Sequence, residues 1–150
     1  MKKITLLLLC CLLVLCLVTQ SQAAGTVTQT STNVSKDVTQ LTYTWTADAS
    51  DGSVPATSSE QSYDGYVVLV VTDPGSTAPT DNYDITLTDG DGVDIMGGTL
   101  ANRDTANTEQ AVPKIDAVYG ARWVSGAITL TITNNSVNSA TGEVKIWIVR

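Results

Sequence analysis

A run of aspartates is the first group of side chains in this sequence that could do chemistry. Asp89, Asp91 and Asp94 lie close together, separated by Gly90 and Gly92. Carboxylate oxygens are the ligands that calcium prefers, so these three aspartates are candidate calcium ligands. The helix-flanked calcium loop ends in a glutamate, which this run lacks. The alternative is a hairpin whose Asp-Gly pairs meet the backbone demands of a turn. We expect no other cofactor.

The three tryptophans form a second candidate site. Trp45, Trp123 and Trp147 would offer aromatic faces on which a sugar ring can stack. Trp147 lies between Ile146 and Ile148 in an alternating run, so its side chain is expected to point away from theirs. The sequence contains no phenylalanine, so the alternative is that tryptophan and tyrosine supply the bulk of the core.

Most residues that catalyse reactions are missing. The chain has no histidine, and its three cysteines, Cys10, Cys11 and Cys16, all lie near the N-terminus. Without an imidazole or a downstream thiolate, the Ser-His-Asp, Cys-His and zinc arrangements cannot form there. Carboxylates remain, but no pair stands out as a glycosidase couple. We therefore expect the protein not to be an enzyme.

The N-terminus is typical of a signal peptide over residues 1–23. Lys2 and Lys3 precede an apolar run over residues 4–18, and small residues lead to a cleavage site after Ala23 or, as a second choice, after Ala24. The run is shorter than the roughly 20 residues of a membrane-spanning helix, although an uncleaved anchor is the alternative. The protein is thus predicted to be periplasmic, cell-surface or extracellular, without stable membrane insertion after cleavage.

Cleavage would leave an acidic chain without cysteine. Loss of Lys2 and Lys3 changes the net charge from −7 to −9. The remaining basic residues are scattered, and phosphate binding needs a basic face, so no nucleic-acid partner is expected. No disulfide can form either, so the fold must be held by its core.

The elements that must position these residues are strands. Apolar and polar residues alternate over residues 41–47, whereas residues 66–71 are apolar throughout and predict a central strand covered on both faces. Residues 83–95 predict a hairpin around the aspartate run. Residues 128–132 and 144–149 alternate again and predict an antiparallel hairpin.

Two segments are less regular. Residues 113–120 start with proline and end with glycine, which favours one short helical turn. Residues 24–37 are rich in threonine and serine and form either a flexible leader or a polar edge strand. About six to eight strands in one domain over residues 38–150 predict an all-β antiparallel β-sandwich, immunoglobulin-like or jelly-roll-like.

Several stretches carry a resemblance to a known group of proteins. They are GYVVLVVTDPG (65–75), APTDNYDITL (78–87), DGVD (91–94), ANRDTANTEQ (101–110) and GAITLTITN (126–134). In these stretches the chain resembles small uncharacterised virion-associated (head or tail) β-sandwich proteins of tailed phages and prophages. The resemblance implies a structural or assembly module that self-associates or decorates a larger surface. Phage components normally carry no export signal, so either the domain has been recruited to the cell exterior or the leader has another role.

Two functions are therefore expected from the sequence. The first is the structural module, with protein partners or self-association. The second is a secreted binding module for glycan or cell surface. In this module the tryptophans would stack on the ligand, and calcium at the aspartate run would stiffen the fold.

Overall fold

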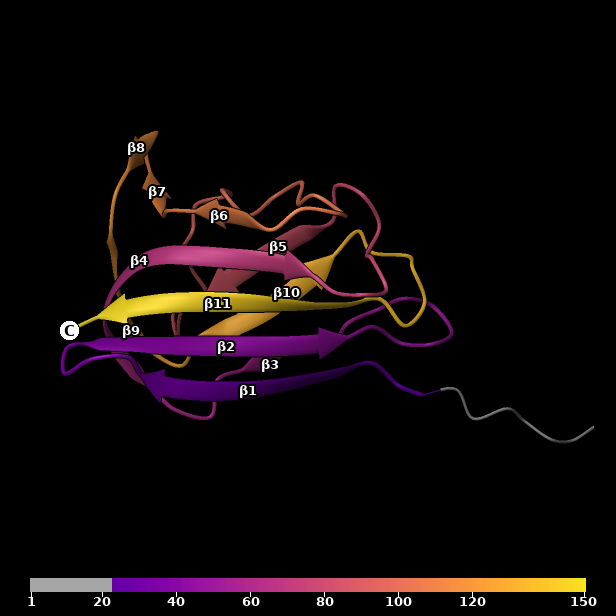
Figure 1. Cartoon of the computed structure of the whole chain (residues 1–150). Helices are drawn as coiled ribbons and strands as arrows, with labels where there is room; N and C mark the ends of the chain where they lie inside the picture. The colour runs from indigo at the N-terminus through magenta and orange to yellow at the C-terminus, as the bar shows by residue number, and fades with distance from the viewer. Residues whose placement is uncertain (1–22) are drawn as a thin grey trace, which may run out of the picture.

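The computed structural model describes residues 23–150, which form two packed antiparallel sheets and a small separate hairpin (Figure 1). The strands are β1 (Thr26–Asn33), β2 (Val38–Thr46), β3 (Thr57–Ser58), β4 (Tyr63–Pro74), β5 (Asp84–Thr88), β6 (Glu109–Ala111), β7 (Lys114–Ile115), β8 (Val118–Tyr119), β9 (Arg122–Gly126), β10 (Thr129–Thr133) and β11 (Thr141–Val149). The larger sheet has the order β1-β2-β11-β4-β6, with β9 also pairing with β4. The smaller sheet is β3-β10-β5, and β7 pairs with β8.

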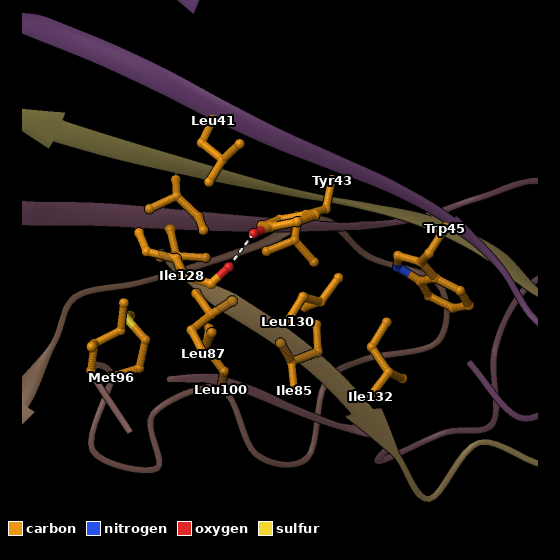
Figure 2. Close-up of a cluster of buried hydrophobic side chains, with 14 of the residues drawn as sticks. Leu41, Tyr43, Trp45, Ile85, Leu87, Met96, Leu100, Ile128, Leu130 and Ile132 are labelled. Atoms are coloured by element: carbon orange, nitrogen blue, oxygen red, sulfur yellow. Dashed lines mark hydrogen bonds between the residues drawn. The ribbon is translucent and has the colours of Figure 1, made fainter. Parts of the chain in front are cut away.

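The predicted all-β sandwich is confirmed. The small sheet lies behind the large one, and side chains from both fill the space between them (Figures 1 and 2). The structure over residues 23–150 offers no helix long and apolar enough to cross a membrane. The predicted signal peptide, with its cysteines, falls outside the described residues except for Ala23.

Strict alternation explains why these segments are strands with one buried face. In β2, Leu41, Tyr43 and Trp45 are buried, while the threonines between them face outward. Successive side chains of a strand point to opposite faces, so the sequence pattern turns directly into an inner and an outer face. The same alternation in β11 buries Val144, Ile146 and Ile148 against the small sheet. The outer face of the large sheet is left to polar and mixed residues.

The core carries one polar link between the sheets. The Tyr43 hydroxyl donates a hydrogen bond of 2.5 Å to the Ile128 carbonyl oxygen (Figure 2). Burial raises the pKa of Tyr43 above its ordinary range, so the hydroxyl keeps the proton that makes this bond. Trp45 packs against the Tyr83 ring, with 6.0 Å between the ring centroids.

The predicted hairpin between residues 128–132 and 144–149 is wrong. β10 lies in the small sheet between β3 and β5, whereas β11 lies in the large sheet between β2 and β4. Both strands have an apolar face, and these faces meet across the core instead of lying side by side in one sheet. Periodicity reveals a buried face but not the sheet to which the strand belongs.

The predicted hairpin over residues 83–95 forms only at its turn. β5 is its first arm, but the second arm is reduced to a single bridge between Thr88 and Asp94. The Ile95 amide also donates to the Leu87 carbonyl oxygen at 2.8 Å. The ladder of β5 is made with β10, so the chain after the turn covers the other edge of β5 without becoming a full strand.

The predicted helical turn in residues 113–120 is wrong as well. The segment is the β7–β8 hairpin, in which Lys114 pairs with Tyr119 and Ile115 with Val118. The two residues of its tip, Asp116 and Ala117, have φ of 48° and 69°. Positive φ at both central positions defines a type I′ turn, whose twist suits a hairpin. Neither residue is glycine, so the residue types at the tip do not predict this turn.

The threonine-rich segment is an edge strand. β1 pairs antiparallel with β2 along its whole length, from Thr26 opposite Thr46 to Asn33 opposite Thr39. Of the two interpretations offered by the sequence, the flexible leader is therefore wrong for these residues.

Candidate functional site

The outer face of β4 is partly open to solvent. Val67 and Val70 point into the core and are fully buried, whereas Tyr66 on the other face is 48% exposed. Leu69 is partly exposed, and the register of β4 shifts between Trp147 and Ile148 of β11. The prediction that this strand is covered on both faces is therefore wrong. An apolar strand whose outer face meets no second layer offers that face to other molecules.

Tyr66 forms an exposed aromatic pair with Trp123. The two residues are cross-strand partners on β4 and β9, and their rings meet edge to face with centroids 5.1 Å apart. Trp123 is 53% exposed. Such a pair is held in place by its own ring contact, so it presents a fixed aromatic surface.

The structure separates the three predicted tryptophans. Trp147 points away from the core, as its place in the alternating run indicated, and is partly exposed on the face that carries Tyr66 and Trp123. Trp45 is 1% exposed in the core and cannot reach a ligand. Two of the three candidate binding residues therefore lie on one accessible face.

The edge of β4 beyond this pair is divided. β9 pairs with Tyr63 to Val67 and β6 pairs with Val70 to Thr72, so Val68 and Leu69 belong to neither ladder. Between β6 and β9 the chain leaves the sheet as the β7–β8 hairpin, which projects from the sandwich (Figure 1).

A pocket of about 610 Å³ lies at this division. It is lined by Leu69, Gly97, Gly98, Thr99, Gln110, Ala111, Val112, Lys114 and Tyr119. The Lys114 ammonium lies 5.7 Å from the centroid of the Tyr119 ring, a distance at which a cation is attracted to the ring face. The volume of the pocket lies in the range of small-molecule sites. Its lining combines apolar side chains with the Lys114 ammonium and the Gln110 amide.

Hydrogen bonds join the loop that lines the pocket to the base of the hairpin. The Lys114 amide donates to the Met96 carbonyl oxygen at 3.2 Å. The Thr99 hydroxyl lies 3.1 Å from the carbonyl oxygens of Met96 and Val112. Gly97 has φ of 61°, and a Cβ there would overlap the Lys114 carbonyl oxygen. Close backbone approach therefore requires glycine at this position and fixes the hairpin base.

Most of the exposed large apolar side chains lie on the chain segment that carries the hairpin or beside it in the sheet. Eight large apolar residues are exposed among residues 23–150, and six of them belong to what we call the hairpin patch. The hairpin patch consists of Tyr66, Val112, Ile115, Val118, Tyr119 and Trp123. Trp123 is one of the predicted binding residues, and Tyr66 and Tyr119 are among the tyrosines that could add to its aromatic surface. No local pattern indicates that these side chains are exposed, because exposure here depends on β4 having no outer cover.

Two of the three predicted calcium ligands, Asp89 and Asp94, accept backbone hydrogen bonds within their own turns. The Asp89 carboxylate accepts the amides of Asp91 and Val93 at 3.1 and 3.0 Å. Asp94 accepts the amides of Met96 and Gly98 at 3.0 and 2.7 Å. No group of three acidic, histidine or cysteine side chains in residues 23–150 is placed to hold a metal ion. The carboxylates of Asp89 and Asp94 therefore bind amides of their own turns, in line with the alternative interpretation of the run, and the calcium site stays a prediction.

Comparison with known protein families, with curated proteins and with solved structures finds no match for this chain. The resemblance to virion-associated proteins therefore stays a prediction.

Proposed function

We propose that this protein is a non-catalytic structural module that attaches to a protein surface through the hairpin patch. The observation that carries the proposal is that six of the eight exposed large apolar side chains among residues 23–150 lie on the segment from Val112 to Trp123 or on its strand partner Tyr66. Large apolar patches on soluble proteins mark interaction sites.

The chemistry of the hairpin patch suits a protein partner. Tyrosine and tryptophan are enriched at the centres of protein interfaces, and Tyr66, Tyr119 and Trp123 are all exposed here. The adjoining pocket would receive one apolar side chain of the partner, with Lys114 beside it for a polar or acidic neighbour. The partner that we propose is a further copy of the chain.

The predicted export and the resemblance to virion components support a role on a particle or cell surface. A module of this kind needs a rigid fold and an exposed apolar interaction surface, but no proton-transfer groups. The absence of histidine from the sequence and the engagement of Asp89 and Asp94 in turns favour that assignment over catalysis.

Analytical ultracentrifugation of residues 24–150 tests the proposal. We expect concentration-dependent association that Tyr66→Ser and Trp123→Ser each weaken by about tenfold or more, as for the central residues of an interface. Val93→Ser is the matched control, because Val93 is 43% exposed but lies outside both the hairpin patch and β1. Association unchanged by both patch substitutions would refute the proposed surface.

A glycan-binding module is the second candidate. The observation that favours it is the placement of Trp123 and Trp147 on one face, where they could stack on a sugar. Glycan addition should then protect tryptophan fluorescence from acrylamide quenching, and Trp123→Ser should abolish the protection. A lack of binding to any glycan on a broad array would exclude this candidate.

A further inference from the structure

β1 is a long, regular and uncovered sheet edge. It pairs with β2 over all eight of its residues without a register shift. The strand TVTQTSTN contains no charge and no proline, which are the features that natural proteins use to block pairing at an edge. An edge of this kind is a template for another strand.

The backbone groups at this edge can be assigned from the register. The Val34 amide donates to the Val38 carbonyl oxygen, and hydrogen-bonded pairs recur at every second position of an antiparallel ladder. The even-numbered threonines of β1 therefore exchange hydrogen bonds with β2. The amides and carbonyls that point to the free edge belong to Val27, Gln29, Ser31 and Asn33.

Side chains hold this edge rigidly. The Gln29 amide group donates to the Ser58 carbonyl oxygen at 3.2 Å and accepts the Glu60 amide at 2.9 Å. Val27 packs against the core. The strand is therefore already in the conformation that a partner strand needs, so pairing costs little ordering entropy.

The other edges of the sandwich are short or covered. The free side of β5 receives backbone hydrogen bonds from the following loop, including Arg103 to Tyr83 at 2.7 Å and Ile95 to Leu87 at 2.8 Å. β3 has two residues, and on the far side of the larger sheet the outer strands β6 and β9 have three and five residues. Among residues 23–150, β1 is the long edge without such cover.

We propose that two copies of this chain pair antiparallel through β1, about a two-fold axis at Thr30. In this register Gln29 lies opposite Ser31 of the second copy, and Val27 lies opposite Asn33. The four residues of each strand whose amides and carbonyls point to the edge all pair with the second copy, which gives about eight backbone hydrogen bonds. The even-numbered threonines remain on one face, with Thr28 opposite Thr32, and cross-strand threonine pairs are favourable. The contact is the same patch on both subunits and closes at two copies.

Cysteine crosslinking tests the register. Residues 24–150 contain no cysteine and include every residue of the described core, so this segment serves as the folded unit. In Thr30→Cys the two Cα atoms would lie about 4.5 Å apart, within disulfide range. Thr42→Cys is the matched control, because Thr42 is the β2 partner of Thr30. Two Thr42 positions would be roughly 14 Å apart, beyond disulfide reach.

We expect mild oxidation to convert Thr30→Cys largely to a covalent dimer and to leave Thr42→Cys monomeric. Ser31→Pro removes an edge amide that β2 does not use, so it should weaken dimerisation at least tenfold while the melting temperature stays nearly constant. Crosslinking of Thr30→Cys no faster than that of Thr42→Cys would overturn the proposal.

The proposal for the hairpin patch and the proposal for the β1 edge can be refuted independently. Thr30→Cys crosslinking that survives Trp123→Ser supports the edge whatever the patch does. Association that depends on Trp123 but is unchanged by Ser31→Pro would overturn the edge and leave the proposed function standing.

Discussion

Single buried tyrosines show how this core combines apolar packing with a few polar links. Tyr43 joins the two sheets through the Ile128 carbonyl oxygen, which also accepts the Ser59 amide at 2.8 Å. Tyr83 is buried beside Trp45. Burial raises the pKa of Tyr83 to about 12, although nearby Arg103 lowers it in part.

The raised pKa values predict loss of stability at alkaline pH. The unfolded chain loses the protons of Tyr43 and Tyr83 near pH 10, but the folded chain keeps them to higher pH. Their stabilising contribution is therefore complete below pH 10 and falls as the pH rises toward 12, by about 1.4 kcal/mol per pH unit for each retained proton. Urea titrations between pH 8 and 12 measure this slope. A flat profile across that range would contradict the account.

Tyr43→Phe should lower the free energy of unfolding by about 1 kcal/mol. The substitution removes one hydrogen bond to the Ile128 carbonyl oxygen, which keeps its bond to the Ser59 amide and so is not left unpaired. Tyr66→Phe at the exposed tyrosine is the control and should have almost no effect. Equal melting temperatures for the Tyr43 variant and the wild type would show that the inter-sheet bond contributes nothing.

The sequence predicts the direction in which a strand residue points, but not whether that residue is exposed to solvent. The outward direction of Trp147 followed from alternation, because a strand has a period of two. The burial of Trp45 could not be separated from ligand binding by pattern, since both uses need the same side chain. Whether an outward residue meets solvent depends on layers formed by distant parts of the chain, which no local pattern contains.

At the scale of elements, strand positions were predictable and strand partners were not. β10 and β11 both alternate and follow one another, yet the intervening loop carries the chain from one sheet to the other. The sequence of residues 113–120 predicts a helical turn where the structure has the β7–β8 hairpin. The tip of this hairpin uses Asp116 and Ala117 in place of the glycine that usually marks a type I′ turn.

Ala117→Gly should stabilise the β7–β8 hairpin by about 0.5–1 kcal/mol. Ala117 has φ of 69°, a conformation that costs an L-residue energy and glycine little. Slower exchange of the Gly120 amide, which donates to the Pro113 carbonyl oxygen at 2.9 Å, would report the gain. Ala121→Gly, just beyond the hairpin, is the control. Faster exchange in the Ala117 variant would argue against the turn.

The whole molecule combines a closed core with two open surfaces. One continuous apolar cluster joins the sheets without any disulfide in residues 23–150. The hairpin patch and the β1 edge lie at opposite sides of the larger sheet, since β1 ends one side of its strand order and β6 and β9 end the other. A rigid body with two distinct surfaces at opposite ends suits a component of a larger assembly.

Light scattering coupled to size-exclusion chromatography on residues 24–150, over a wide concentration range, tests most directly whether the protein works by association. We predict a molar mass that rises with concentration from that of one chain to that of two or more, and that falls back when Ser31→Pro and Trp123→Ser are combined. A mass that stays at one chain up to the highest concentration would contradict the account.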